Sequence, residues 1–363
     1  MMRFLVLILF CLPALALQAK DVMGDLRNQD LEFTQVIPGK ALKFPRDHGS
    51  HPDYRIEWWY LTANLSDRQG RQWGLQWTLF RQALSAGEMQ AGWENNQMWM
   101  AHAAITTPDG HFYEQRFARG GIGQAGVNRI SDDGYFNAWM DDWQWRSNSA
   151  ALLPARLSFN VGDRSVTLLL EATGELVENG VNGYSQKSQQ GLASYYYSQP
   201  HIRVRGFVSQ GLEKEYLTGK GWLDREWSSQ PLAANQQGWD WFSLHLDDGY
   251  KLMIYRIRQD DGNDWLSGNW IGPLGKAQQL DKNAIELSSL DTRAVVTGSD
   301  RTRKLPMEWQ LALVEQKRSW RIKPLYDQQW MDTRIPYWEG VVLVEDENGN
   351  PSGVGYMELT GYE

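Results

Sequence analysis

Hydrophobic and polar positions alternate in short segments along most of this chain. From Glu57 onward, runs rich in aromatic, threonine, leucine and valine residues are broken by turns of aspartate, asparagine and glycine. Such runs cover 57–65, 73–81, 100–106, 164–171, 239–246, 252–258 and 340–345. Strand-like runs recurring about every 8–12 residues are typical of antiparallel sandwiches and barrels. No stretch keeps a helical period over three turns, and the best helix candidate, 280–290, is short.

A weak internal repeat divides the chain into two halves. The segment Glu57–Asp67 aligns with Gly238–Asp248, and each is followed by a second strand-like run that ends in arginine, at Arg81 and Arg256. The offset is about half the chain, which favours two similar β domains over one. Chance similarity between two tryptophan-rich hairpins is the alternative. We therefore predict an all-β protein with domains at 40–221 and 222–363.

Composition limits the function classes. Among 363 residues there are 36 Lys and Arg against 44 Asp and Glu, so the net charge is −8 and nucleic-acid binding is a poor hypothesis. The 19 Trp, 15 Tyr and 11 Phe form an aromatic excess. Such rings suit both the surfaces of β-strands and the walls of apolar cavities.

The first residues have the form of a secretory signal. Arg3 precedes an apolar run, Phe4–Leu17, and a small residue, Ala19, follows. We predict a cleaved signal peptide at 1–19, a lead-in segment at 20–39 and a periplasmic or secreted location; an uncleaved anchor is the alternative. Cys11 is the only cysteine, so the mature chain would have no disulfide and no cysteine ligand or nucleophile.

Common catalytic signatures are missing from the sequence. It contains no Walker loop, no HExxH and no GxSxG motif. The six histidines have no spacing with carboxylates that would complete a metal site. We therefore expect no metal and no cofactor.

The segment Trp222–Trp227 carries the most suggestive chemistry. In a strand, Trp222, Asp224 and Glu226 would share one face. A carboxyl group between indoles is partly desolvated, which raises its pKa and makes it a proton donor at neutral pH. The alternative is structural: Asp224 would then be a buried carboxylate paired with an arginine such as Arg225 or Arg81.

Two other aromatic patches have both structural and functional interpretations. Tyr195 and Tyr197 would share a strand face, where they would either pack or line a pocket and stabilise a cation through their rings. Glu57 lies beside Arg55 and two indoles, and both faces of its strand carry tryptophan. We interpret Glu57 as a paired, buried carboxylate with a structural role.

Together these patches resemble the AttH-like / carotenoid 1,2-hydratase (CrtC-like) family. The resemblance covers about residues 45–363 and rests on long aromatic motifs. They are His51-Pro52-x-Tyr54-x-x-Glu57-Trp58-Trp59-Tyr60, Gly74–Arg81, Ala101–Ile105, Tyr195–Ser198, Trp222–Trp227, Trp239-Asp240-Trp241 and Gly355–Tyr362. It implies two lipocalin-like β domains packed together. Members of this family include carotenoid hydratases, kievitone hydratase-like proteins and secreted hydrolase-like proteins, and the AttH-like branch is associated with ABC-type export systems.

The resemblance also implies a site. The family's hydratases add water to a C=C bond with a carboxylic acid donor, a His-x-Trp pair and a Tyr-x-Asp pair. Here those positions read Tyr195-x-Tyr197 and Trp222-x-Asp224, so the acid is kept and the imidazole is not. A tyrosine, with a pKa near 10, cannot replace an imidazole base at neutral pH. This difference brings the chain nearer to the AttH-like branch.

Two functions follow as hypotheses. The first is a periplasmic protein that binds a lipid or isoprenoid and assists an ABC-type permease. The alternative is a hydratase or hydrolase for an apolar, carotenoid-like substrate, with Asp224 as the proton donor, Glu226 as a polarising carboxylate and Trp222, Tyr195 and Tyr197 around the developing charge. The candidate ligand-binding residues are Trp58, Tyr60, Trp77, His102, Trp239 and Trp241.

Overall fold

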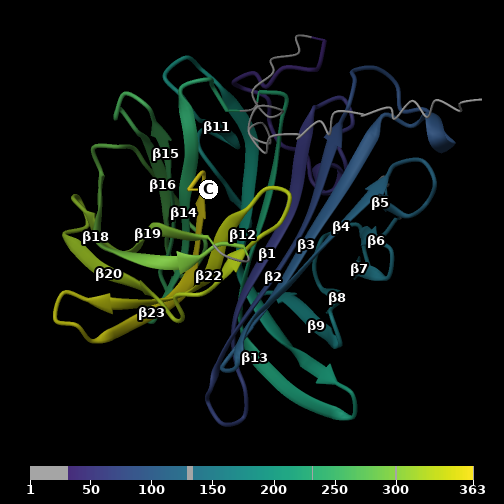
Figure 1. The fold of residues 1–363 in the computed structure, drawn as a ribbon. Coiled ribbons are helices and arrows are strands. Elements are labelled where there is room, and N and C mark those ends of the chain that lie inside the picture. The colour runs from purple at the N-terminus through teal and green to yellow at the C-terminus, as the bar shows by residue number, and fades with distance from the viewer. Residues whose placement is uncertain (1–31, 129–133, 231, 299–300, 363) are drawn as a thin grey trace, which may run out of the picture.

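The protein consists of two curled antiparallel β-sheets that lie side by side (Figure 1). A computed structural model describes residues 32–128, 134–230, 232–298 and 301–362. Within these residues the helical elements are two short 3₁₀ turns, η1 (Arg46–His48) and η2 (Gly92–Glu94). The all-β prediction of two lipocalin-like domains is therefore confirmed. The predicted signal peptide, 1–19, and most of the lead-in, 20–39, lie outside the described residues.

The first sheet has 13 strands, in the order β4-β3-β2-β1-β13-β12-β9-β8-β7-β6-β5, with β10 and β11 paired to β12. Its strands are β1 (Ile56–Ser66), β2 (Gln72–Ala83), β3 (Gln97–Thr107), β4 (Gly110–Arg119), β5 (Ala125–Val127), β6 (Asn137–Met140), β7 (Trp143–Ser147), β8 (Ala155–Val161), β9 (Arg164–Ala172), β10 (Val177–Glu178), β11 (Tyr184–Gln186), β12 (Ala193–Gln210) and β13 (Glu213–Ser228).

The second sheet has 10 strands, in the order β17-β16-β15-β14-β23-β22-β20-β19-β18, with β21 paired to β22. Its strands are β14 (Gln236–Leu246), β15 (Lys251–Gln259), β16 (Trp265–Ile271), β17 (Ala277–Leu280), β18 (Ile285–Val296), β19 (Thr302–Leu313), β20 (Arg318–Pro324), β21 (Trp330–Met331), β22 (Tyr337–Asp346) and β23 (Pro351–Thr360). The range 280–290 belongs to β17, a turn and β18, so the one helix candidate of the sequence is a strand region.

The two sheets are built alike around their first strands. β1 lies between β2 and the last strand of its sheet, β13, and β14 lies between β15 and the last strand of its sheet, β23. The two aligned segments of the repeat thus form the equivalent hairpins β1–β2 and β14–β15. The chain passes from one sheet to the other between Ser228 and Gln236, whereas the expected boundary at 221/222 falls inside β13. β13 cannot be divided there because it pairs with β1 without interruption from Thr218 to Ser228.

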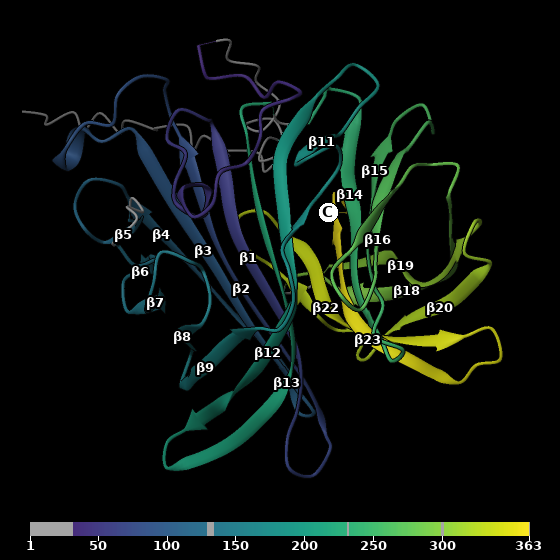
Figure 2. The ribbon, with the colours of Figure 1, turned by 180° about the vertical axis from the view of Figure 1, so that it is seen from behind.

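The three largest hydrophobic clusters of the described residues follow from the alternation of side chains along these strands. One fills the inner side of the first sheet and includes Trp59, Trp77 and Trp227. A second fills the inner side of the second sheet, with Phe242 and Trp309 among its members. The third contains residues of both sheets and lies between them, where β1, β12 and β13 pass beside β14, β22 and β23 (Figure 2).

Candidate functional site

The face of β13 that carries Asp224 is turned toward the second sheet. Trp222 belongs to the cluster between the sheets, whereas Leu223 and Trp227 belong to the core of the first sheet. Because side chains alternate along a strand, Asp224 and Glu226 lie on the same face as Trp222. The predicted sharing of a face by these three residues is confirmed.

Among the described residues, all side chains that donate a hydrogen bond to Asp224 are neutral. The hydroxyl of Tyr196 donates to Oδ2 at 2.7 Å, and the hydroxyl of Ser198 and the indole Nε1 of Trp222 donate to Oδ1 at 2.5 and 2.8 Å. The residue is 3% exposed. Burial raises the pKa of Asp224 to about 7 despite these hydrogen bonds, and the Glu226 carboxylate raises it further. This carboxyl group is therefore suited to hold and release a proton near neutral pH.

The second sheet closes over this acid with aromatic side chains. Trp241 of β14 donates its indole Nε1 to the Tyr196 hydroxyl at 3.3 Å. Its ring meets the ring of Tyr60 edge-on, with centroids 5.3 Å apart. Tyr60 lies directly opposite Asp224 in the β1–β13 register. Asp224 is thus surrounded by rings from four strands, β1, β12, β13 and β14.

Two glutamates of the second sheet complete the cluster. Glu339 of β22 and Glu358 of β23 lie opposite one another in register. Tyr60 donates its hydroxyl to Glu339 at 2.8 Å, and Trp239 donates its indole to Glu358 at 2.7 Å. Burial raises the pKa of Glu358 to about 7. Burial and the nearby Glu358 hold the pKa of Glu339 well above its usual range. The interface therefore holds three carboxyl groups whose pKa is raised above the usual range.

Glu226 has a different environment from Asp224. Lys187, which follows β11, lies 3.0 Å from Glu226, and its ammonium group also lies over the rings of Tyr196 and Tyr255. Glu226 is opposite Trp58 in the β1–β13 register, and Trp58 is half-buried. Glu226 is thus an ion-paired carboxylate at the edge of the site, a partner suited to polarising rather than to donating a proton.

Tyr195 and Tyr197 lie on the opposite face of the sheet from Asp224. Tyr195 is opposite Trp227, and Tyr197 is opposite Arg225. The hydroxyl of Tyr195 bonds to the backbone of Ile37, and that of Tyr197 to His48. The expectation that these tyrosines surround the charge at Asp224 is therefore wrong. The register places the neighbouring residues Tyr196 and Ser198 there, because side chains alternate along β12.

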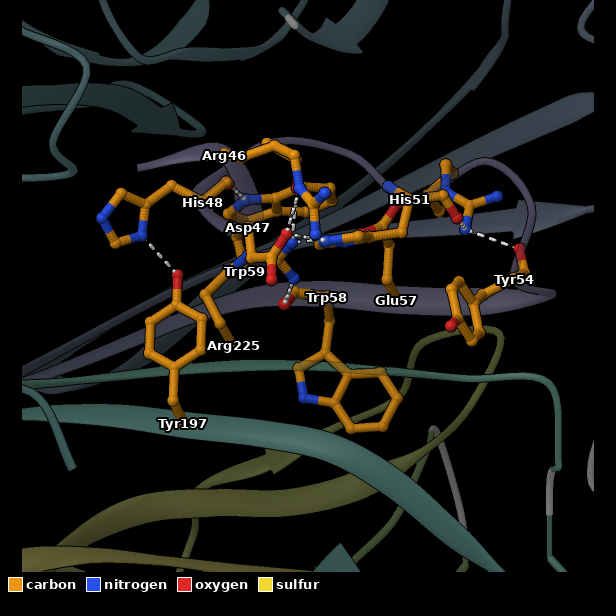
Figure 3. A network of polar contacts seen from close by, with 12 residues as sticks. Arg46, Asp47, His48, His51, Tyr54, Glu57, Trp58, Trp59, Tyr197 and Arg225 are labelled. Atoms are coloured by element: carbon orange, nitrogen blue, oxygen red, sulfur yellow. Dashed lines mark hydrogen bonds and ion pairs between the residues drawn. The ribbon is translucent and has the colours of Figure 1, made fainter. Parts of the chain in front are cut away.

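Glu57 is a buried carboxylate that two arginines, Arg81 and Arg225, neutralise. Figure 3 shows Glu57 with Arg225 and His51. Its carboxylate lies 2.5 Å from Nε of Arg81 and 3.1 Å from Nη2 of Arg225, and His51 contributes a further contact. Although burial alone would raise it, Arg81, His51 and Arg225 hold the pKa of Glu57 well below its usual range. The structural interpretation of Glu57 is confirmed, whereas the pairing of Asp224 with Arg225 or Arg81 is wrong.

The candidate ligand-binding residues separate into three groups. Tyr60, Trp239 and Trp241 contact the acid cluster, and Trp58 faces its edge. The remaining two residues lie elsewhere. His102 lies on the same face of the sheet but away from the acid: its Nδ1 is 2.8 Å from the Tyr337 hydroxyl, and burial lowers its pKa to about 3. Trp77 is fully buried in the first core against Trp145, so it is a packing residue.

Sequence reasoning missed four residues of the cluster. Tyr196 and Ser198 are each one position after the predicted site residues Tyr195 and Tyr197. The sequence does not show which of the two alternating faces of β12 lies on the same side as Asp224 of β13. Glu358 lies inside the C-terminal motif that carried the family resemblance, so it could have been found there. Glu339 had no such signal, since only the pairing of β22 with β23 brings it to Glu358.

Other features of the described residues are separate from this cluster. An open hollow of about 490 Å³ lies between the β3–β4 turn and the loop after β20, with Asp109, His111, Arg293 and Tyr326 in its lining. No group of three or more His, Cys, Asp or Glu among the described residues is arranged to hold a metal ion. No helix in the described part of the chain is long and apolar enough to cross a membrane.

Comparisons with known proteins identify the family. The AttH-like family model matches residues 35–362. The chain belongs to the AttH-like family. It is 34% identical to an AttH protein of Nitrosomonas europaea of known structure, with a TM-score of 0.79 over 91% of this chain and 100% of that one. No curated protein matches it.

Two more distant structures share the fold of this AttH-like chain. Kievitone hydratase of Nectria haematococca is 15% identical, with a TM-score of 0.65 over 92% of this chain and 96% of that one. CghA is 12% identical, with a TM-score of 0.57 over 92% and 97% of the two chains. At these identities the likeness concerns the fold alone.

Proposed function

We propose that this AttH-like protein is an acid catalyst that acts on an apolar, unsaturated molecule between its two β domains, in the manner of a hydratase. The observation that carries the proposal is Asp224: a deeply buried carboxyl group, bound by three neutral donors and enclosed by aromatic rings. A carboxyl group that is neutral near pH 7 is the donor that protonation of an isolated C=C bond requires.

The reaction can be written with this chain's own residues. The O–H bond of Asp224 breaks, its proton forms a C–H bond with one alkene carbon, and the electron pair of the C=C bond is used in that bond. The other carbon becomes cationic, and the faces of Trp222, Trp241 and Tyr60 stabilise it. Water then adds to the cation and loses a proton, which returns to the Asp224 carboxylate. Glu226 at the edge favours the cation electrostatically.

Binding without turnover is the second candidate function. In this version the protein carries a lipid or isoprenoid in the periplasm and assists an ABC-type permease. It is favoured by the absence of an imidazole at Tyr196 and Ser198, the two positions of β12 that face the acid. The secretory signal expected at 1–19 is consistent with this location.

Asp224→Asn tests the catalytic proposal. The amide keeps an oxygen for Ser198 and Trp222 and offers an N–H to the Tyr196 oxygen, but it has no proton to give. With squalene and lycopene as probe substrates and water labelled with heavy oxygen, we expect mass spectrometry to show that the rate falls by about 10²–10⁴. Titration of tryptophan fluorescence with the same probes should show unchanged binding.

A matched control is Asp163→Asn, which removes an exposed carboxylate paired with Arg164 in the first domain. Its turnover and binding should equal those of the wild type. Turnover that survives in Asp224→Asn contradicts the proposed role of Asp224. Saturable binding of the probes with no turnover in the wild type selects the carrier, and no response of either kind contradicts both functions.

A further inference from the structure

A second polar cluster lies between the sheets, beyond Trp222 from the acid. It consists of Lys220 on β13, His201 on β12, His245 on β14 and Lys251 on β15, and we call it the basic cluster. Ile202 lies opposite Gly221 and belongs to the first core, so the adjacent His201 has the face toward the second sheet, where it acts electrostatically on His245. The ring of His245 meets that of Trp222 at 5.7 Å between centroids. Lys251 is opposite His245 in the β14–β15 register. The basic cluster and Asp224 are thus separated by the indole of Trp222, whose Nε1 binds the acid.

Lys220 faces the same space. Along β13 it precedes Trp222 by two residues, so it shares the face of Trp222 and Asp224. Its partner in the β1–β13 register, Asn64, donates a hydrogen bond across the interface to the carbonyl of Gly355 in the second sheet. The face that carries Lys220 therefore looks toward the second sheet.

Burial increases from the lysines to the histidines. Lys220 is exposed and Lys251 is half-buried. His201 and His245 are 4% and 2% exposed. The basic cluster therefore reaches from the protein surface into the interface, with the lysines outside and the imidazoles at its inner end.

The basic cluster has no acidic counterpart among the described residues. Burial lowers the pKa of Lys251 to about 8, and Lys220 lowers it further. Burial, Lys251, Lys220 and His201 hold the pKa of His245 well below its usual range. Burial and Lys251 lower the pKa of His201 to about 4. The groups that act on one another here are all basic, in contrast to Lys187, which has Glu226 at 3.0 Å.

Polar atoms of the inner end also lack partners within the described chain. Nε2 of His201 and Nδ1 of His245 are buried and make no hydrogen bond. Nζ of Lys251 donates to the carbonyl of Gly249 at 3.1 Å and, with three donor protons, keeps capacity for other acceptors. Most buried polar groups in folded proteins have a hydrogen-bond partner, and each one without a partner calls for an explanation, of which a bound ion is one.

We propose that the basic cluster is an anion-binding site that takes a carboxylate or phosphate group, with Lys220 and Lys251 supplying charge and His201 and His245 supplying ring N–H donors. An anion offers several acceptor lone pairs at once, so it satisfies the unpartnered nitrogens and removes the repulsion between the two lysines.

The position of Trp222 suggests the class of molecule that carries this anion. One face of the interface would bind an anionic end at the basic cluster, and the aromatic rings around Asp224 would contact an apolar body. The inference that the ligand is an anionic amphiphile rests on the proposed function. The inference that the basic cluster binds an anion does not.

Titration calorimetry on the whole protein tests the site. The probes are inorganic phosphate, dodecyl phosphate and laurate, below their critical micelle concentrations and at constant ionic strength. We expect saturable binding that Lys251→Met weakens about 10-fold or more, because a charged hydrogen-bond partner is lost. Lys220→Met, at an exposed position that does not endanger folding, should weaken binding less. Lys304→Met, which removes an exposed lysine of β19, is the matched control and should not change it.

Equal affinity for phosphate and dodecyl phosphate supports a site for a free anion, and tighter binding of dodecyl phosphate or laurate supports the amphiphile. No binding of any probe, or binding that Lys251→Met and Lys220→Met leave unchanged, overturns the anion site. Because no step at Asp224 is involved, an inactive but anion-binding protein would contradict the proposed function and leave the anion site standing.

Discussion

Two buried carboxyl groups lie on opposite faces of the same sheet and have opposite partners. Glu57 on β1 faces the first core, where Arg81 and Arg225 neutralise it. Asp224 on β13 faces the interface, where its partners are the hydroxyls of Tyr196 and Ser198 and the indole of Trp222. Both are almost fully buried, at 0% and 3% exposure. Burial alone therefore does not decide the charge of either group.

The comparison shows that the hydrogen-bond and ion-pair partners of a buried carboxyl group decide whether it is charged. Two guanidinium groups favour the ionised form, so Glu57 is a permanent anion that ties β1 to β2 and β13. Neutral donors do not offset the loss of water around Asp224, so its protonated form is favoured. The first arrangement stabilises a fold, and the second keeps a proton available for chemistry.

The second domain also has one carboxylate paired with arginines and one buried carboxyl group that faces the interface. Asp240 faces the inner side of its sheet and lies 2.7 Å from Arg256 and 2.5 Å from Arg258. Glu358 faces the interface and is bound by the indole of Trp239. In each domain the arginine-paired carboxylate thus lies within the domain, and the carboxyl group with a raised pKa lies between the domains.

The largest effect should come from Glu57→Gln. It leaves Arg81 and the fully buried Arg225 without their anion, and breaking a buried ion pair in this way costs about 3–5 kcal/mol of unfolding free energy. Urea denaturation would measure the loss. Glu114→Gln, which breaks the partly exposed contact with Arg116, is the control and should cost at most about 1 kcal/mol. If Glu57→Gln and Glu114→Gln lost equally small amounts of unfolding free energy, the buried ion pair of Glu57 would not have the stabilising role that distinguishes it from Asp224.

The two carboxyl groups should also give opposite pH dependence. The pKa of Glu57 is lowered in the folded state, so its stabilisation is present above the unfolded value of about 4.3 and is lost as pH falls below it. The pKa of Asp224 is raised to about 7, so the folded state binds its proton more tightly and loses stability as pH rises from about 4 to 7.

Subtracting the unfolding free energy of the wild type from that of each variant at the same pH removes the contribution of the buried histidines, which both proteins share. The stability deficit of Glu57→Gln should shrink as pH falls below about 4. Asp224→Asn should become more stable than the wild type as pH rises from about 4 to 7, because it cannot ionise. Urea midpoints measured between pH 3 and 8 would give both curves. Parallel curves for Asp224→Asn and the wild type would show that Asp224 is not protonated in the folded protein.

The smallest effect should be that of Asp224→Asn at about pH 3, where the wild-type carboxyl group is neutral in both the folded and the unfolded protein. The amide has the same shape and can keep the contacts with Tyr196, Ser198 and Trp222, so we expect a change below about 1 kcal/mol. Thermal unfolding would measure it. A loss comparable to that of Glu57→Gln at pH 7 would mean that a charged partner of Asp224 exists in solution.

The local pattern of the sequence was sufficient for much of the fold. Turn spacing predicted strands, the repeat predicted two domains with equivalent hairpins, and alternation placed Trp222, Asp224 and Glu226 on one face. It also indicated that Glu57 is paired. These features depend on neighbours along the chain, since side chains in a strand alternate with a period of two.

Only the tertiary structure decided which groups meet. The register of β12 against β13 brings Tyr196 rather than Tyr195 or Tyr197 to Asp224, and a shift of one residue would have exchanged the two faces. The docking of the second sheet brings Glu339 to Tyr60, 279 residues away in sequence. Strand register and domain docking are fixed by packing between distant segments, and a single sequence carries no local signal for either. This is why Asp224 and Trp222 were found from the pattern, whereas Tyr196 and Ser198 were not.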